Sequence, residues 1–232
     1  MSAEFDPYRN SYTESVDHAI AFARTDSVFF AELKACDLIA LSRRHLGRPN
    51  RARVLDFGCG TGVIDSLIAP QFAEVVGVDV SGGLLDVAAE KNPGLEYRQY
   101  DGATIPYDDS SFDLAFAASV FHHIEPSRRR SATEEIARVV RPGGFVVVYE
   151  HNPLNPLTRL AVSRCEFDDD VELLSLRGAN SLLRQCGLDP IESRYIAFFP
   201  WRGRVLRTIE SRLARVPLGG QYAVAAIKPG RP

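Results

Sequence analysis

A glycine-rich segment at residues 54–62, with the sequence VLDFGCGTG, has the composition of a ligand-binding loop. Gly58, Gly60 and Gly62 allow the backbone to approach a ligand closely, because they carry no Cβ atom. A helix that starts after such a loop offers free N–H groups and partial positive charge, which suit a pyrophosphate or a methionine carboxylate. The GxGxG spacing places Val63 where dinucleotide-binding loops of the GxGxxG type have their third glycine, and this favours the methionine carboxylate.

Three carboxylates stand where the apolar pattern predicts the ends of strands, and they could hold the rest of such a ligand. Asp56 precedes the loop, where it can organise the turn and help to hold an ammonium group. Asp79 can accept both hydroxyls of a ribose, although the same position would suit NAD or would cap a helix. Asp101, followed by Gly102, can accept the amine of an adenine or can serve as a turn residue. Open α/β sheets bind ligands at the carboxyl ends of their strands, so the three positions are compatible with one site.

Candidate proton acceptors follow the fourth and fifth predicted strands. His122, His123 and Glu150 could take a proton from a hydroxyl, an amine or an acidic carbon, and His151 is a further candidate. Packing or hydrogen bonding is the alternative role for the histidines. The acidic run at 168–170 could hold a cation, but a solvated loop is favoured because no His or Asn lies at ligand spacing beside it. The sequence therefore predicts no metal site.

The hydrophobic pattern predicts strands and helices that alternate through the middle of the chain. Expected strands cover 53–57, 74–80, 95–100, 112–120, 145–150, 190–199 and 222–228. Expected helices cover 15–24, 26–45, 61–69, 81–91, 127–140, 175–186 and a stretch around 205–213. Residues 142–144, with the sequence PGG, are expected to form the turn that ends the fifth of these helices. Residues 152–170 form the least regular stretch.

This order of elements predicts an α/β fold of the Rossmann-like type. The expected sheet has seven strands, is mostly parallel, is flanked by helices and carries an antiparallel pair at one edge. The N-terminal helices are expected to form a helical extension over residues 1–48, and residues 49–232 the Rossmann-like core of a single domain. Tyr8, Tyr12 and Phe29 could close over a ligand as a lid or could simply pack.

Four segments in order resemble the motifs of class I S-adenosylmethionine-dependent methyltransferases, in the branch similar to the ubiquinone and menaquinone biosynthesis methyltransferases (methyltransferase type 11). They are VLDFGCGTG, VVGVDVS, YDGATIPYDDSSFDLAFAASVFHHI and RVVRPGGFVVVYE, and they cover roughly residues 50–150. The resemblance implies S-adenosylmethionine as cofactor and S-adenosylhomocysteine as product. Together with the loop it gives the expected cofactor-binding set: Asp56, Gly58, Cys59, Gly60, Gly62, Asp79, Val80, Asp101, Gly102 and Ser119.

The expected function is methyl transfer to an oxygen, nitrogen or carbon atom of a small molecule, in secondary-metabolite, glycan or lipid biosynthesis. A protein of the same fold that binds the cofactor for a cyclisation or as a scaffold is the first alternative, and an NAD-dependent oxidoreductase is the second. The run from Ser119 to His122 (SVFH) lacks the Asp/Asn-Pro-Pro-Tyr/Phe motif of amino-methylating DNA enzymes. No nucleic-acid partner is therefore expected.

Composition points to a soluble protein. The net charge is −3, the four cysteines are scattered, and no apolar run approaches the roughly 20 residues that span a bilayer. With a polar N-terminus unlike a signal peptide, these features predict a cytoplasmic protein. Only three of the 27 basic residues are lysines (Lys34, Lys91 and Lys228), which we interpret as coding bias.

The C-terminal region carries most of the positive charge. Residues 191–232 contain eight basic and two acidic residues, a net charge of +6 against −9 for the remainder. With Phe198, Phe199 and Trp201 nearby, this region could contact an anionic or lipid-linked substrate or a membrane surface. The solvated face of an amphipathic helix is the alternative, and the sequence favours it.

Overall fold

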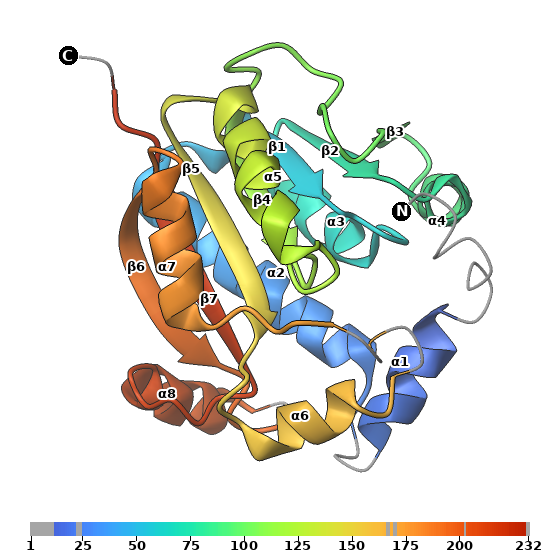
Figure 1. Ribbon diagram of the computed structural model, residues 1–232, viewed down its shortest axis with the longest axis vertical. Helices are drawn as coiled ribbons and strands as arrows, with labels where there is room; N and C mark the ends of the chain where they lie inside the picture. The colour runs from blue at the N-terminus through green and yellow to red at the C-terminus, as the bar shows by residue number, and fades with distance from the viewer. Residues whose placement is uncertain (1–11, 22–24, 166–167, 169–170, 202, 231–232) are drawn as a thin grey trace.

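A seven-stranded sheet forms the centre of the computed structural model, which describes residues 12–21, 25–165, 168, 171–201 and 203–230 (Figure 1). The strands are β1 (Arg53–Phe57), β2 (Glu74–Asp79), β3 (Glu96–Gln99), β4 (Phe112–Ala118), β5 (Val140–His151), β6 (Asp189–Ile196) and β7 (Gln221–Ile227). Their order is β3-β2-β1-β4-β5-β7-β6. The first five strands pair in parallel, and β7 runs antiparallel to both of its neighbours. This confirms the predicted mostly parallel, Rossmann-like sheet.

Helices cover both faces of the sheet. The α-helices are α1 (Tyr12–Ile20), α2 (Ser27–His45), α3 (Val63–Ile68), α4 (Gly82–Lys91), α5 (Pro126–Val139), α6 (Pro156–Val162), α7 (Leu176–Gln185) and α8 (Arg204–Leu213). Short 3-10 turns, η3 (Pro49–Arg51) and η4 (Ala69–Gln71), precede β1 and β2. Asp26, Ser81 and Ser175 each accept a backbone N–H in the first turn of the helix that follows, which fixes where α2, α4 and α7 begin.

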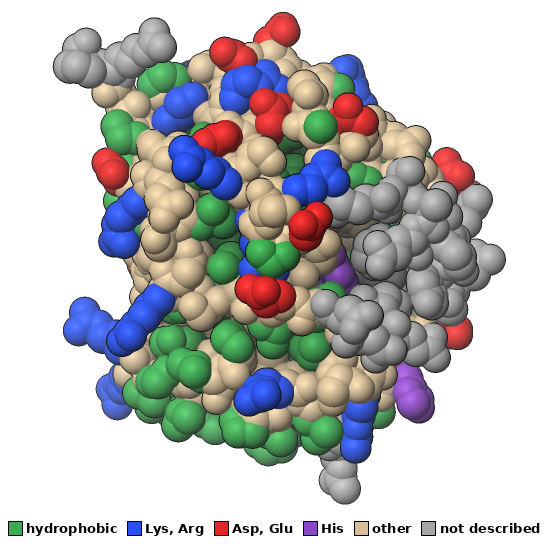
Figure 2. All heavy atoms as spheres, viewed as in Figure 1, with side chains coloured by type: hydrophobic (Ala, Val, Ile, Leu, Met, Phe, Trp, Pro, Cys, Tyr) green, Lys and Arg blue, Asp and Glu red, His purple; other side chains and the backbone are tan. Residues whose placement is uncertain are grey.

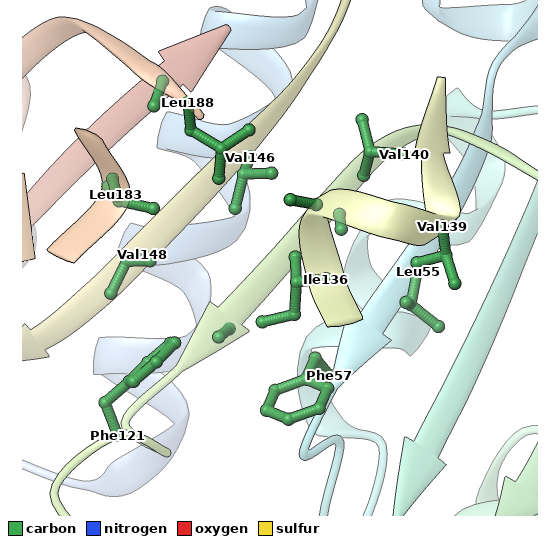
Figure 3. Packing of buried hydrophobic residues seen from close by; sticks show 14 of the residues in the cluster. Leu55, Phe57, Phe121, Ile136, Val139, Val140, Val146, Val148, Leu183 and Leu188 are labelled. Carbon is green, nitrogen blue, oxygen red and sulfur yellow. The ribbon is translucent and has the colours of Figure 1, made fainter. Parts of the chain in front are cut away.

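Two apolar clusters lie on opposite faces of the sheet. The larger joins β1 and β5 to α5 and α7, whose side chains meet in Figure 3. The second cluster packs α2 and α3 against the other face. Neighbouring residues of β5 alternate between them, with Val146 and Val148 in the first and Val147 and Tyr149 in the second, as the period of a strand requires. Both faces of the sheet are therefore buried, as the apolar runs of the strands predict.

Two predictions of local structure are wrong. The stretch 152–170 was expected to be irregular, but it contains α6, which starts because the Asn155 side chain accepts the N–H groups of Leu157 and Thr158. The PGG run at 142–144 was expected to end a helix as a turn, but it lies within β5. Within the strand the run is irregular: Gly143 has a left-handed backbone (φ +76°), and the pairing of β4 with β5 shifts register beside it. The Gly143 N–H donates to the carbonyl of Lys228, just after β7, and the Lys228 N–H donates to the carbonyl of Gly144.

None of the helices in the described residues is long and apolar enough to cross a bilayer.

Candidate functional site

A cavity of about 320 Å³ lies at the carboxyl ends of β1, β4 and β5. Its walls come from α1, α2, the glycine-rich loop, the segment after β4, α6, and the segments around 198 and 221. Five of the ten residues predicted to bind the cofactor line this cavity: Asp56, Gly58, Cys59, Gly60 and Ser119. His122 and His123 line the other half, together with His151. The cavity therefore connects the loop with the predicted proton acceptors.

Each glycine of the loop has a left-handed backbone and a different surrounding. A Cβ atom on Gly58 (φ +74°) would lie 2.6 Å from a methyl group of Val120, and one on Gly62 (φ +67°) would lie 2.5 Å from the hydroxyl of Tyr97. Gly60 (φ +53°) faces open space, with nothing within 4 Å of such an atom. Gly58 and Gly62 thus allow close packing of the loop, while Gly60 leaves room beside the cavity.

Two buried carboxyl groups, Asp56 on β1 and Asp65 on α3, flank the glycine-rich loop. Burial and their mutual proximity raise the pKa of Asp56 well above its ordinary range, and burial raises the pKa of Asp65 to about 6. The hydroxyl of Tyr97 donates to Asp65 Oδ2 over 3.1 Å. Among the described residues, Asp56 Oδ1 has no hydrogen-bond partner, although it is buried and its residue lines the cavity. Such an orphaned acceptor fits a ligand's ammonium group.

Lys34 is a site residue that the sequence reasoning missed. It projects from α2, is 7% exposed, and donates from Nζ to Ser119 Oγ over 2.9 Å. Burial lowers its pKa to about 8, although Glu150 and Asp56 oppose that shift. Ser119 itself has a positive φ of 62°, which is rare outside glycine and typical of constrained functional positions. The signal in the sequence was a lone lysine on an apolar helix face in a chain with only three lysines among 27 basic residues.

The remaining predicted cofactor residues lie outside the cavity lining. Asp79 is buried, and its oxygens accept the N–H groups of Gly60 and Ser81 over 2.8 and 2.9 Å, so it ties the loop to the next helix. Asp101 is exposed and accepts two N–H groups of the turn that follows it, which lowers its pKa. Val80 and Gly102 stand beside these two residues in the chain, and both bind neighbouring side chains through their carbonyl oxygens.

His122 and Glu150 form a buried pair at the far end of the cavity. Nδ1 of His122 lies 2.7 Å from Glu150 Oε2, and the backbone N–H of Phe121 donates to Glu150 Oε1 over 2.7 Å. Burial opposes ionisation of Glu150, but His122 outweighs it and holds the pKa at about 2. Burial also opposes protonation of His122, yet Glu150 and Asp168 raise its pKa above the usual value. A carboxylate only accepts, so Nδ1 donates to Glu150, and Nε2 lies 3.7 Å from Oδ1 of Asp168, another residue of the cavity lining.

A second acid, Asp168, joins the histidines, which corrects the expectation that it lies in a solvated loop. Asp168 is 8% exposed, and its Oδ1 lies 3.5 Å from His123 Nε2 and 3.7 Å from His122 Nε2. Asp168 thus meets two histidines that lie 46 and 45 residues earlier in the chain. Asp169 and Asp170 lie outside the described residues.

The two histidines beside His122 favour the neutral imidazole, and His122, His123 and Asp168 form a cluster with metal-binding dimensions. Burial lowers the pKa of His151 to about 3 and that of His123 well below its usual value. The ring centroids of His122 and His123 lie 4.0 Å apart, with the two rings tilted by 46°. Donor atoms of His122, His123 and Asp168 lie within 4.8 Å of one another, so these three residues could hold a divalent cation.

The predicted aromatic lid is corrected in part. Phe29 is buried in the fold at 7% exposure, and its neighbour Phe30 lines the cavity instead. The two rings meet edge to face at 5.2 Å, which fixes Phe29 inward. Tyr8 and the side chain of Tyr12 lie outside the described residues.

Sequence comparison relates the central part of the chain to known proteins. Residues 55–148 match the family model described as a methyltransferase domain. The chain is 37% identical over 101 residues to a tRNA (carboxymethyluridine(34)-5-O)-methyltransferase of Arabidopsis thaliana, a match that covers 43% of this chain and 24% of that protein. It is 35% identical over 112 residues to a demethylmenaquinone methyltransferase of Clavibacter sepedonicus, covering 46% and 44%. The chain thus spans less than half the length of these relatives.

Structural comparison extends the likeness to the whole fold. An S-adenosylmethionine-dependent methyltransferase of Thermotoga maritima superimposes with a TM-score of 0.68 at 18% identity. The superposition covers 98% of this chain and 100% of that one. At this identity the match concerns the fold.

Proposed function

We propose that the chain is a class I S-adenosylmethionine-dependent methyltransferase, which transfers the methyl group of S-adenosylmethionine to a small-molecule acceptor; the methyltransferase-domain match over residues 55–148 supports this. The observation that carries the proposal is that one cavity runs from the glycine-rich loop to His122, the partner of Glu150. Its volume of about 320 Å³ is that of a small-molecule site.

The residues of the loop half fit the cofactor. Asp56 Oδ1, buried and without a partner among the described residues, would receive the ammonium of the methionine part. Lys34, held over Ser119, would bind its carboxylate. Asp79 and Asp101, at the ends of β2 and β3, would take the ribose and the adenine. The bound cofactor supplies a methyl group on a sulfonium, which is already an activated leaving group.

The residues of the histidine half would prepare the acceptor. His122 Nε2 would receive the proton of the acceptor hydroxyl, amine or acidic carbon, and Glu150 would stabilise the imidazolium that forms. Phe30 and α6 would exclude water from the space between the two halves. Alignment of the acceptor in such a dry pocket supplies much of the rate enhancement in a displacement of this kind.

The cofactor assignment is tested by ligand binding. S-adenosylmethionine at 100 times its Kd should stabilise the folded protein by about 2.7 kcal/mol, and NADH should not. Asp79→Ala should weaken S-adenosylmethionine binding by about 1–3 kcal/mol, because charge-assisted hydrogen bonds are lost. Asp86→Ala, an exposed acid on α4, is the matched control and should bind normally. Stabilisation by NADH alone would overturn the assignment.

The reaction is tested by its product. Formation of S-adenosylhomocysteine should depend on a small oxygen, nitrogen or carbon nucleophile from a panel of acceptors. Unmodified tRNA belongs in the same panel, since one relative methylates tRNA by name. Turnover with tRNA alone would overturn the small-molecule acceptor. Tight cofactor binding together with a rearranged substrate and no S-adenosylhomocysteine would favour the cyclisation alternative.

A further inference from the structure

The strongly exposed large apolar side chains gather at one end of the molecule. This surface, the α6–α8 end, consists of residues 151–165 and 197–220. It carries six such side chains, between 39% and 62% exposed: Leu154, Leu157, Leu160, Trp201, Ile209 and Leu218. In the described residues the other three, Val28, Leu67 and Ile191, are scattered elsewhere. Figure 2 shows hydrophobic and basic side chains together over α6 and α8.

Hydrogen bonds make the α6–α8 end one continuous surface. The Asn155 side chain, which caps α6, donates to the carbonyl of Leu218 over 2.6 Å, and Thr158 donates to the carbonyl of Gly220 over 2.8 Å. Glu210 of α8 accepts the N–H groups of Phe198 and Phe199 over 2.8 and 3.2 Å. Hydrogen bonds thus hold segments that are far apart in the chain next to one another, so that their apolar side chains lie on the same surface.

The charge of the α6–α8 end is opposite to that of the rest of the chain. Its two segments contain seven arginines and a single acid, Glu210, a net charge of +6 in a chain of net charge −3. Glu210 is half-buried and engaged by backbone N–H groups, whereas Arg159, Arg212 and Arg215 are exposed. The surface thus combines exposed leucines and a tryptophan with nearly uniform positive charge.

We propose that the α6–α8 end docks on the surface of an anionic lipid bilayer. Exposed leucines and tryptophan beside arginines are the composition of interfacial membrane-binding segments, in which apolar side chains enter the headgroup boundary and arginines bind anionic lipids. A nucleic-acid interface would share the charge but not the exposed leucines. A second copy of the chain would bring the same positive charge to the contact and would be repelled.

The position of the cavity connects this surface to the substrate. Leu157 both lines the cavity and is 61% exposed, and Phe198 and Pro200 line the cavity from the segment that precedes α8. The cavity therefore reaches the surface that would face the bilayer. If the chain transfers a methyl group as proposed above, its acceptor is an amphiphile resident in the membrane. The polar head of that amphiphile would enter between α6 and the histidines.

Trp201 provides a direct probe of docking, because it is the only tryptophan of the chain and is 58% exposed within this surface. The purified protein is titrated, without cofactor, with vesicles of phosphatidylcholine containing 30% phosphatidylglycerol, and with pure phosphatidylcholine vesicles. With the anionic vesicles, the Trp201 emission should shift to shorter wavelength and the protein should sediment with the lipid. Binding should weaken as salt rises, since the arginines are exposed.

Matched variants assign the binding to this surface. Ile209→Asp and Leu218→Asp should each lower vesicle affinity about tenfold, since a charge replaces an inserted apolar side chain. Ile191→Asp is the control, because Ile191 is 42% exposed, close to the 40% of Ile209, and lies on β6 away from the α6–α8 end. Circular dichroism and S-adenosylmethionine binding verify that each variant is folded.

Three outcomes would overturn the docking proposal. They are no spectral shift with anionic vesicles at low salt, equal affinity for neutral vesicles, or equal losses in Ile191→Asp and Ile209→Asp. Dimerisation through this surface in light scattering, or tRNA binding that resists vesicle competition, would assign it another occupant. Vesicle binding without turnover of any acceptor in the panel would retain the docking and reject the proposed reaction, whereas turnover of water-soluble acceptors alone would retain the reaction and reject the amphiphilic acceptor.

Discussion

The two halves of the cavity are assembled from the chain in different ways. The loop half takes Asp56, the three glycines and Asp65 from ten consecutive residues, so one local turn positions most of its groups. The histidine half collects His122, Glu150 and Asp168 from three segments of the chain, and its geometry depends on tertiary packing. A compact, locally encoded half suits a constant ligand, and a dispersed half suits an acceptor that differs between enzymes of one fold. The two halves should therefore respond differently to substitution.

The largest effect is expected from Glu150→Gln. This change keeps the side-chain volume but removes the charge that orients His122 and stabilises its imidazolium. The turnover number kcat should fall by about 10²–10⁴-fold, while the Kd for S-adenosylmethionine changes by less than about threefold. Steady-state kinetics and calorimetry measure the two quantities separately.

Asp37→Asn is the matched control for that change. Asp37 accepts the hydroxyl of Tyr149, the residue next to Glu150, but it lies on the opposite face of β5. The kcat of the Asp37→Asn protein should stay near the wild-type value. A Glu150→Gln protein that turns over normally but binds the cofactor weakly would place Glu150 in the loop half and would remove the contrast between the halves.

The next largest effect is a loss of stability, which should differ between substitutions at two glycines of the loop. Gly58→Ala adds a Cβ atom 2.6 Å from the stiff side chain of Val120 in a left-handed backbone, so the free energy of unfolding should fall by about 2–5 kcal/mol. Gly60→Ala has the same backbone cost but open space, and should lose only about 1–2 kcal/mol. Urea unfolding compares them. Equal losses would mean that the loop relaxes around Val120.

The fold and the loop half could be predicted from the sequence because both depend on short-range patterns. The strand β1 and the caps Asp26, Ser81 and Ser175 follow from apolar runs and single polar residues beside them. The helix α6 was missed because two asparagines and a proline precede it and a second proline begins it, a composition typical of loops, although one of those asparagines is its cap.

The histidine half could be predicted only as a list of residue types. His122, His123 and Glu150 were identified as candidate bases, but their pairing spans 28 residues and has no signature in the chain. Asp168 was predicted to lie in solvent because no His or Asn stands at ligand spacing beside it in the sequence, whereas its partners are His122 and His123. Lys34 was missed for the same reason, since its partner Ser119 lies 85 residues away. Contacts between distant segments depend on packing, which periodicity does not specify.

A smaller effect is expected at Lys34, which stands between the two halves. Lys34→Met should lower S-adenosylmethionine affinity about tenfold, because one charge-assisted hydrogen bond to the carboxylate is lost. In the wild-type protein the affinity should also fall as pH rises through about 8, where the buried ammonium loses its proton. The cofactor titrates as well, so the difference between wild type and variant isolates Lys34.

Lys91→Met, at the exposed end of α4, is the matched lysine control and should bind like the wild type at each pH. The stability of the free protein provides a second check of the direction in which the pKa of Lys34 is shifted. Because the pKa of Lys34 is lowered from 10.5 to about 8 in the folded state, the unfolded chain binds more protons between these values. The stability of the free protein should therefore rise with pH in that window, relative to Lys34→Met. A parallel pH dependence in both proteins would contradict a buried ammonium.

The smallest expected effect is that of metal removal, and it decides how the histidine half works. His122, His123 and Asp168 have the mutual separation of metal ligands, but His122 Nε2 cannot bind a cation and accept a proton at once. If His122 receives the proton, dialysis against EDTA should leave kcat within about twofold of its starting value, and added Zn²⁺ should inhibit by occupying the base. Kinetics before and after dialysis, with metal analysis of the protein, measure this. Activity that disappears with one equivalent of metal and returns with it would contradict the base, and would make the dispersed half a metal centre built from the same three residues.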